Sequence, residues 1–123
     1  MMKIIIKRVY DEPKKLDGKR VLIDRLWPRG LSKEEAGIDL WHAEVAPSTK
    51  LRQWFGHDSK KWEEFKRRYL KELKANKESV KKLKDYISPL PCATLLFAAR
   101  SLEFNHAIVL KDFLKEKTRS HKK

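Results

Sequence analysis

The segment that most constrains the fold is ATLLFAAR, residues 93–100, which is apolar at almost every position. A half-exposed strand alternates apolar and polar side chains, whereas a strand of a parallel sheet is covered on both faces and is apolar almost throughout. The run is also far shorter than the roughly 18 apolar residues of a membrane helix. It therefore predicts a buried strand in a parallel sheet.

Two more strands and several helices are predicted around this strand. Residues 3–10 are short and β-branched, and residues 20–26 begin as an apolar run, so both are predicted strands. Apolar side chains then recur at helical spacing, with a break expected near Asn76. They are Trp62, Phe65, Tyr69, Leu73, Val80, Leu83 and Ile87. A last helix is predicted over residues 107–118.

Short polar motifs predict where three intervening helices begin. Ser32 stands three residues before Glu35, which is the spacing of a capping box, so a short helix is expected to follow. Asp39 is expected to cap a second short helix through residues 40–45. Ser48 is expected to cap a third, TKLRQWF.

Strands joined by long helical crossovers indicate an α/β fold. We expect a small, mostly parallel sheet of about three or four strands flanked by helices. A chain of 123 residues fits a single domain. The prediction is therefore one α/β domain over residues 1–123, with a frayed tail from about residue 118.

The net charge of +13 comes from 30 Lys and Arg against 17 Asp and Glu. Such a charge favours anionic partners, among them nucleic acid, nucleotides and acidic lipid. A Lys/Glu-rich surface of the kind found in thermophilic proteins explains the same composition, and both explanations stay open.

Cys92 is the single cysteine, so no intramolecular disulfide is predicted. Without a signal peptide or a membrane-length apolar run, we expect a cytoplasmic protein with no membrane partner.

The segment VLIDRLWPRGLS, residues 21–32, places charged side chains at the end of a predicted buried strand. Burying Asp24, Arg25 and Arg29 is costly unless these groups are paired or bind a ligand. In one interpretation, Asp24 forms a structural ion pair with Arg25 or Arg29. In the other, the same side chains belong to a binding site. The sequence leaves both interpretations open.

Polar residues at the strand ends are expected to converge, because ligands of open α/β sheets bind beyond the carboxyl ends of the strands. Guanidinium groups bind phosphate and carboxylate through paired hydrogen bonds, and a helix N-terminus adds free N–H groups. We therefore predict an arginine-rich pocket for an anionic small molecule. The expected ligand-binding residues are Asp24, Arg25, Trp27, Arg29, His57, Arg100 and Asn105.

Motifs of several common chemistries are missing from the sequence. Its four glycines do not cluster into a phosphate-binding loop. No Cys/His set has zinc-site spacing, and no G-x-S-x-G elbow occurs. We therefore predict no metal, and we leave the cofactor, the reaction and enzyme status open.

An alternative function uses the predicted long helix. Residues 60–86 contain eleven basic and five acidic residues, a net charge of +6. This basic face could make the chain a nucleic-acid-binding module. A third interpretation is a charge-rich domain whose partner is another protein. The oligomeric state is left open.

Four segments resemble the YeaO-like proteins, part of the domain-of-unknown-function family numbered 488. They are DRLWPRGLSKE, VAPSTKLRQWFGHD, WEEFKRRYLKEL and TLLFAARSLEFNHAIVLKDFL, and the likeness runs from about residue 4 to 115. The resemblance implies a compact α/β domain and no settled activity. Some wider members carry a Cys-His pair near the end of the third strand. This chain has Asn105 and His106 there, so thiol chemistry is not carried over.

Overall fold

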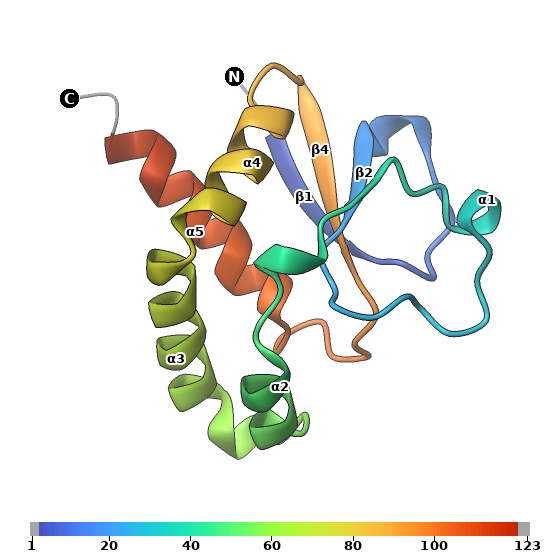
Figure 1. The fold of residues 1–123 in the computed structure, drawn as a ribbon. Coiled ribbons are helices and arrows are strands. Elements are labelled where there is room, and N and C mark those ends of the chain that lie inside the picture. The colour runs from blue at the N-terminus through green and yellow to red at the C-terminus, as the bar shows by residue number, and fades with distance from the viewer. Residues whose placement is uncertain (1–2, 121–123) are drawn as a thin grey trace.

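The computed structural model describes residues 3–120, with side chains through Lys115. It contains one four-stranded sheet, in the order β1-β4-β2-β3, in which every strand pair is parallel. The strands are β1 (Lys3–Arg8), β2 (Lys19–Leu22), β3 (Leu40–Trp41) and β4 (Cys92–Phe97). Figure 1 shows β4 between β1 and β2. The predicted α/β fold with a parallel sheet is confirmed.

Strand β4 is buried on both faces, as its continuous apolar sequence predicted. Because side chains of a strand alternate between faces, its residues divide between two clusters. The larger cluster takes Ala93, Leu95 and Phe97. Leu96 packs in the smaller cluster, on the other face. Thr94 shares that second face, and its buried hydroxyl donates to the carbonyl of Asp17 (2.7 Å).

The long helices gather on one face of the sheet. They are α3 (Trp62–Ala75), α4 (Lys77–Ile87) and α5 (His106–Ser120), and the shorter α2 (Thr49–Phe55) precedes them. In Figure 1, α3, α4 and α5 lie together, whereas the one-turn helix α1 (Lys33–Ala36) lies at the opposite side of the sheet. Single turns of 3-10 helix connect these elements, at η1 (Lys15–Asp17), η2 (Ala43–Val45) and η3 (Ser59–Lys61).

The prediction of a helix over residues 40–45 is wrong. Leu40 and Trp41 form β3, which pairs with the end of β2, and only residues 43–45 make a helical turn. The carboxylate of Asp39 caps no helix. It accepts a hydrogen bond from the backbone N–H of Arg20 (2.8 Å), and this bond helps to hold β3 beside β2.

The ends of the predicted elements also differ from the structure. Strands β1 and β2 end at Arg8 and Leu22, before the predicted limits at residues 10 and 26. Helix α5 extends to Ser120, and the fraying predicted from about residue 118 stays a prediction. The last three residues of the chain lie outside the described residues.

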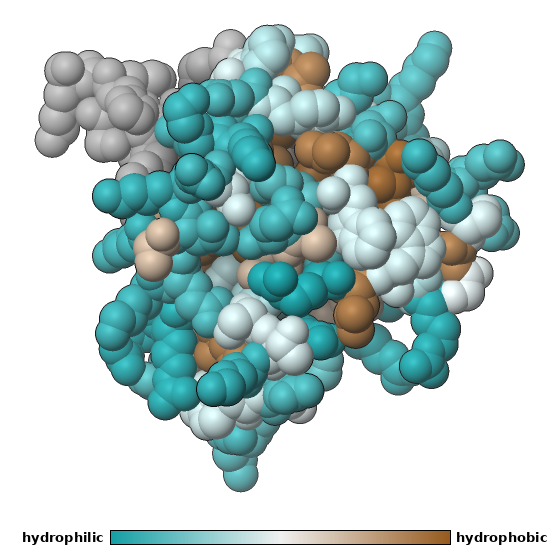
Figure 2. Space-filling view, viewed as in Figure 1, coloured by the Kyte–Doolittle hydropathy of each residue, from teal (hydrophilic) through white to brown (hydrophobic). Residues whose placement is uncertain are grey.

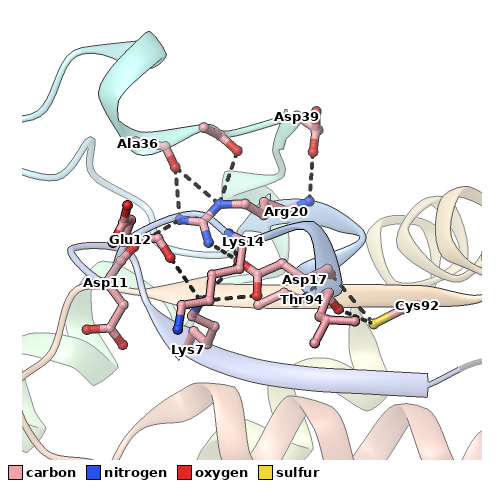
Figure 3. Close-up of polar contacts among 12 residues, drawn as sticks. Lys7, Asp11, Glu12, Lys14, Asp17, Arg20, Ala36, Asp39, Cys92 and Thr94 are labelled. Carbon is pink, nitrogen blue, oxygen red and sulfur yellow. Dashed lines mark hydrogen bonds and ion pairs between the residues drawn. The ribbon is translucent and has the colours of Figure 1, made fainter.

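A buried charge network lies on the second face of the sheet (Figure 3). Asp17 and Arg20 are 4% and 3% exposed, and their side chains form an ion pair. The same carboxylate accepts hydrogen bonds from Nζ of Lys7 and the backbone N–H of Lys14, both at 3.0 Å. Nη2 of Arg20 donates to the carbonyl of Ala36 (2.9 Å). The network therefore connects β1, β2, η1 and α1.

The pKa of Asp17 reflects two opposing effects of this network. Burial raises the pKa of the carboxyl, since it disfavours the charged form. Hydrogen bonds from Lys14, Lys7 and Arg20 act in the other direction and prevail. The pKa of Asp17 therefore lies below its usual value, and the carboxylate is charged at neutral pH.

The surface on the side seen in Figure 2 is mostly hydrophilic. Hydrophobic residues appear there as brown patches among hydrophilic ones. Single exposed apolar residues are normal on a protein surface, whereas large continuous patches indicate a docking face. Within residues 3–120, we find no helix with the length and apolar content that a membrane span requires.

Candidate functional site

A pocket of about 730 Å³ opens beyond the carboxyl ends of β1, β2 and β4. Its volume falls in the range of small-molecule sites, roughly 300–1,000 Å³. All seven residues expected from the sequence line it: Asp24, Arg25, Trp27, Arg29, His57, Arg100 and Asn105. Strand-end geometry therefore brings together residues up to 81 positions apart, from Asp24 to Asn105.

Asp24 is fixed by the end of β4 and by helix α5. Its Oδ2 accepts a hydrogen bond from the backbone N–H of Ala98 (2.9 Å). Its Oδ1 is buried and lies 3.1 Å from Nε2 of His106, but the contact lacks the geometry of a full hydrogen bond. Of the two interpretations left open by the sequence, the ion pair of Asp24 with Arg25 or Arg29 is not formed among the described residues, because the carboxylate faces other partners.

Arg25 braces a loop through backbone carbonyls. Its Nη2 donates to Ala46 (2.9 Å) and its Nε donates to Pro47 (3.2 Å). These bonds hold the segment between η2 and α2 against the end of β2. The guanidinium of Arg25 is therefore fixed in the pocket wall, with Nη1 free of these two hydrogen bonds.

Three further arginines surround the pocket with exposed side chains. They are Arg29, Arg52 and Arg100. Among residues 3–120, none of the three forms an ion pair. Asp24 is the one carboxylate in the described lining, against four arginines. The formal charge of these five side chains is therefore +3.

Contacts between loops set the positions of these arginines. The hydroxyl of Tyr10 donates to the carbonyl of Arg29 (2.9 Å), which ties the loop after β2 to the end of β1. Arg8 donates through Nη2 to the carbonyl of Ala98 (3.2 Å) and through Nε to that of Ala99 (3.0 Å). The chain leading to Arg100 is thereby fastened to β1.

Asn105 caps helix α5, and both polar atoms of its side-chain amide form hydrogen bonds there. Its Oδ1 accepts from the backbone N–H of Ile108 (3.2 Å), and its Nδ2 donates to the carbonyl of Ser101 (3.0 Å). Asn105 is also only 2% exposed. The structure therefore gives it a capping role at the pocket floor.

His106 was not among the expected ligand residues, although it lines the pocket. Its Nε2 lies 2.9 Å from the carbonyl oxygen of Ile23. A carbonyl oxygen only accepts, so Nε2 must carry a hydrogen. Nδ1 forms no hydrogen bond with the described residues. Its place in the sequence could have indicated it, since His106 directly follows Asn105, which was an expected ligand residue.

Aromatic side chains form the apolar part of the lining. Phe55 of α2 stacks on Phe65 of α3, with 4.3 Å between ring centroids, and Phe104 lies beside them in the lining. Trp27 donates from Nε1 to the carbonyl of Leu31 (2.7 Å). Sequence reasoning did not select the three phenylalanines, because large apolar side chains are normally assigned to the core.

His57 and Arg52 reach the pocket from helix α2 and its end. His57 has a φ of +59° and is exposed, and its ring centroid lies 6.2 Å from that of Phe55. Arg52 was noted in a motif of the family but was not selected as a ligand residue. No group of three or more His, Cys, Asp and Glu side chains in the described residues could hold a metal ion.

Comparison with known proteins places the chain among uncharacterised relatives. The profile of the family described as "Inactive DUF488-N3 subclade" matches residues 3–123. The uncharacterised protein YeaO of Escherichia coli K12 is 42% identical over 114 residues, covering 93% of this chain and 98% of the relative. The uncharacterised protein Rv3073c of Mycobacterium tuberculosis H37Rv is 36% identical, covering 91% and 93%. No solved structure matches significantly.

Proposed function

The chain belongs to the DUF488 family, in the group described as its inactive N3 subclade, and on that premise we propose that it binds a small anionic molecule. The ligand carries a phosphate or a carboxylate, and the site is the pocket beyond the strand ends. The word "inactive" in the family description supports binding rather than catalysis. A cytoplasmic location is part of this proposal.

The observation that carries the proposal is the set of unpaired arginines. Arg29, Arg52 and Arg100 line one pocket, and no described carboxylate neutralises them. Like charges held together repel one another, so their approach is unfavourable until an anion neutralises them. Guanidinium groups form paired, charge-assisted hydrogen bonds with phosphate and carboxylate oxygens.

Titration of phosphate and sulfate tests the proposal. Each anion is expected to raise the melting temperature beyond the effect of chloride at equal ionic strength, because it binds the native state. The variants Arg29→Gln, Arg52→Gln and Arg100→Gln are each expected to weaken phosphate binding by about 1.5–3 kcal/mol, the usual contribution of a hydrogen bond to a charged group.

Arg67→Gln is the matched control, because it removes the same charge from α3, outside the pocket lining. Its phosphate affinity is expected to equal that of the unmodified protein. If Arg67→Gln weakens binding as much as the pocket variants do, the effect is one of net charge, and the pocket proposal fails.

The alternative, nucleic-acid binding by the basic helix face, has weaker support. Arg67 and Arg68 both donate to Glu64, and Lys81 donates to Asp85. Hydrogen bonds from the two arginines lower the pKa of Glu64 to about 2, so its charge persists at neutral pH. Part of the basic face is therefore neutralised within the helices, whereas the pocket arginines are not.

A further inference from the structure

We propose that the ligand of this pocket is an aromatic acid, a planar apolar ring joined to a phosphate or carboxylate. The inference rests on the proposed anion site and goes further by naming the part of the ligand that fills the rest of the pocket. An inorganic anion would occupy only a small part of about 730 Å³.

The charged and apolar parts of the pocket are separated by depth. Arg29, Arg52 and Arg100 are exposed, so they stand at the rim. Phe55 and Phe65 also contribute to the lining but are only 5% and 3% exposed, so they lie at its base. A ligand that matches both parts has its acid at the mouth and its apolar body inside.

The apolar base has the properties of an aromatic binding surface. Phe55 and Phe65 are nearly parallel, with 26° between their planes, and Trp62 continues the cluster at 5.7 Å from Phe65. Phe104, which is half-buried, packs edge-on against Trp62 at 5.6 Å. Aromatic rings prefer such offset and edge-on arrangements, so an incoming ring can add to this cluster.

Small residues leave room for a ring on the side of the sheet. Ala98 and Ala99 follow β4 at the pocket, and Ala46 and Pro47 line the side that Arg25 holds in place. None of these four side chains reaches far into the space. The lining therefore combines small side chains with aromatic rings, which suits a flat ligand body.

Phenyl phosphate and methyl phosphate are the probes that test this inference. Both are phosphate monoesters, and at about pH 8, well above a second pKa of about 6, both are dianions that differ mainly in the apolar group. Phenyl phosphate is expected to bind at least ten-fold more tightly by calorimetry, which corresponds to about 1.4 kcal/mol. Benzyl alcohol, a neutral ring, is expected to bind far more weakly than phenyl phosphate, because it lacks the acid.

The variant Phe104→Leu keeps an apolar side chain and removes the ring. It is expected to reduce the preference for phenyl over methyl phosphate at least three-fold, because only phenyl phosphate has a ring to lose contact with Phe104. Phe113→Leu makes the same exchange in α5, outside the pocket lining, and is expected to keep the preference.

Three other results of these binding measurements would each contradict a different part of the proposal. Equal affinities for phenyl and methyl phosphate overturn the aromatic ligand and leave the anion site standing. Benzyl alcohol binding as tightly as phenyl phosphate overturns the requirement for an acid. If neither phosphate ester nor inorganic phosphate binds, the proposed function itself fails, and this inference fails with it.

Discussion

The Oδ1 atom of Asp24 lies 3.1 Å from Nε2 of His106, and the two side chains are only 16% and 14% exposed. Nε2 carries a hydrogen, because it also lies 2.9 Å from the carbonyl of Ile23. The acid at the end of β2 thus faces a donor at the start of α5, although no arginine pairs with it.

Replacing Asp24 with Asn tests this contact. If the new amide oxygen keeps the bond to Ala98, its NH₂ group faces the N–H of His106, and two donors then oppose each other. We expect a loss of about 1–3 kcal/mol in the free energy of unfolding, the cost of an unsatisfied buried group. Phosphate affinity is expected to stay equal or to rise, because a negative charge leaves the pocket. Urea unfolding and phosphate titration measure the two effects.

Asp112→Asn provides the control, since Asp112 is exposed on α5 and does not line the pocket. It is expected to change stability by less than about 0.5 kcal/mol. An Asp24→Asn protein as stable as this control would show that the contact with His106 does not contribute to stability.

The buried carboxylate of Asp17 is expected to make the fold sensitive to acid. Its pKa is lowered in the folded state, so the stabilisation is present above the unfolded pKa of about 4. It is lost as pH falls through the folded pKa. Asp17→Asn is expected to cost about 3–5 kcal/mol, because it leaves Arg20 buried without its partner. Unfolding measured from pH 7 to pH 2 is expected to show a smaller acid-induced loss in the variant.

Asp85→Asn removes a carboxylate that pairs with Lys81 on the surface, where both side chains are mostly exposed. We expect it to cost at most about 1 kcal/mol. Equal losses from Asp17→Asn and Asp85→Asn would contradict the structural role of the buried network.

Gly18 is expected to tolerate no side chain. It has a φ of +64° and a ψ of −140°, and an added Cβ would lie 2.2 Å from the carbonyl oxygen of Cys92. Strain and overlap together are expected to cost about 3 kcal/mol or more in Gly18→Ala. Gly56→Ala is the comparison, because its φ is +53° and its nearest contact is 3.6 Å. Its cost is expected to be about 1–2 kcal/mol, and thermal melts compare the two.

Binding to nucleic acid is expected to be weak and sensitive to salt. A net charge of +13 attracts RNA and DNA at low ionic strength. Because such binding depends on the release of counterions, it is expected to weaken steeply towards about 150 mM salt. Fluorescence anisotropy across a salt series measures this. Sub-micromolar affinity retained at about 150 mM salt would instead favour the nucleic-acid alternative.

Local signals in the sequence predicted much of the fold. Ser32 and Glu35 form the expected capping box of α1, and Ser48 caps α2 as predicted. The break between α3 and α4 falls at Asn76, where it was expected. These features depend on hydrogen bonds and side-chain spacing within a few residues, which is why a single sequence reveals them.

Long-range pairing was not predictable in the same way. The two-residue strand β3 forms because Leu40 and Trp41 meet β2, and their own sequence carries no clear strand pattern. The buried ion pair was sought at Asp24, whereas the structure has it at Asp17 and Arg20. Asp17 lies in the polar segment DEPKKLDGK, whose sequence alone gives no sign of burial. Its burial depends on α1 and β1, which only the folded chain brings together.

The candidate pocket could be predicted in part, better than the long-range pairing but less fully than the local helix signals. A general rule about strand ends brought seven separated residues to one place, and they line a single pocket. The rule does not describe individual side chains. The rule could not tell that the side chain of Asn105 caps a helix whereas the guanidinium of Arg29 does not take part in such a contact. That difference depends on hydrogen bonds formed in the folded loops.

The strand order β1-β4-β2-β3 has a consequence for how the protein is made. Strand β1 pairs only with β4, yet more than eighty residues are translated between them. Until Cys92–Phe97 has been synthesised, β1 and its three consecutive isoleucines therefore have no strand to pair with. Such unpaired strands are prone to aggregate and are typical clients of chaperones. The central strand β4 is the last of the four strands to be translated, so the sheet cannot be completed before β4 has been made.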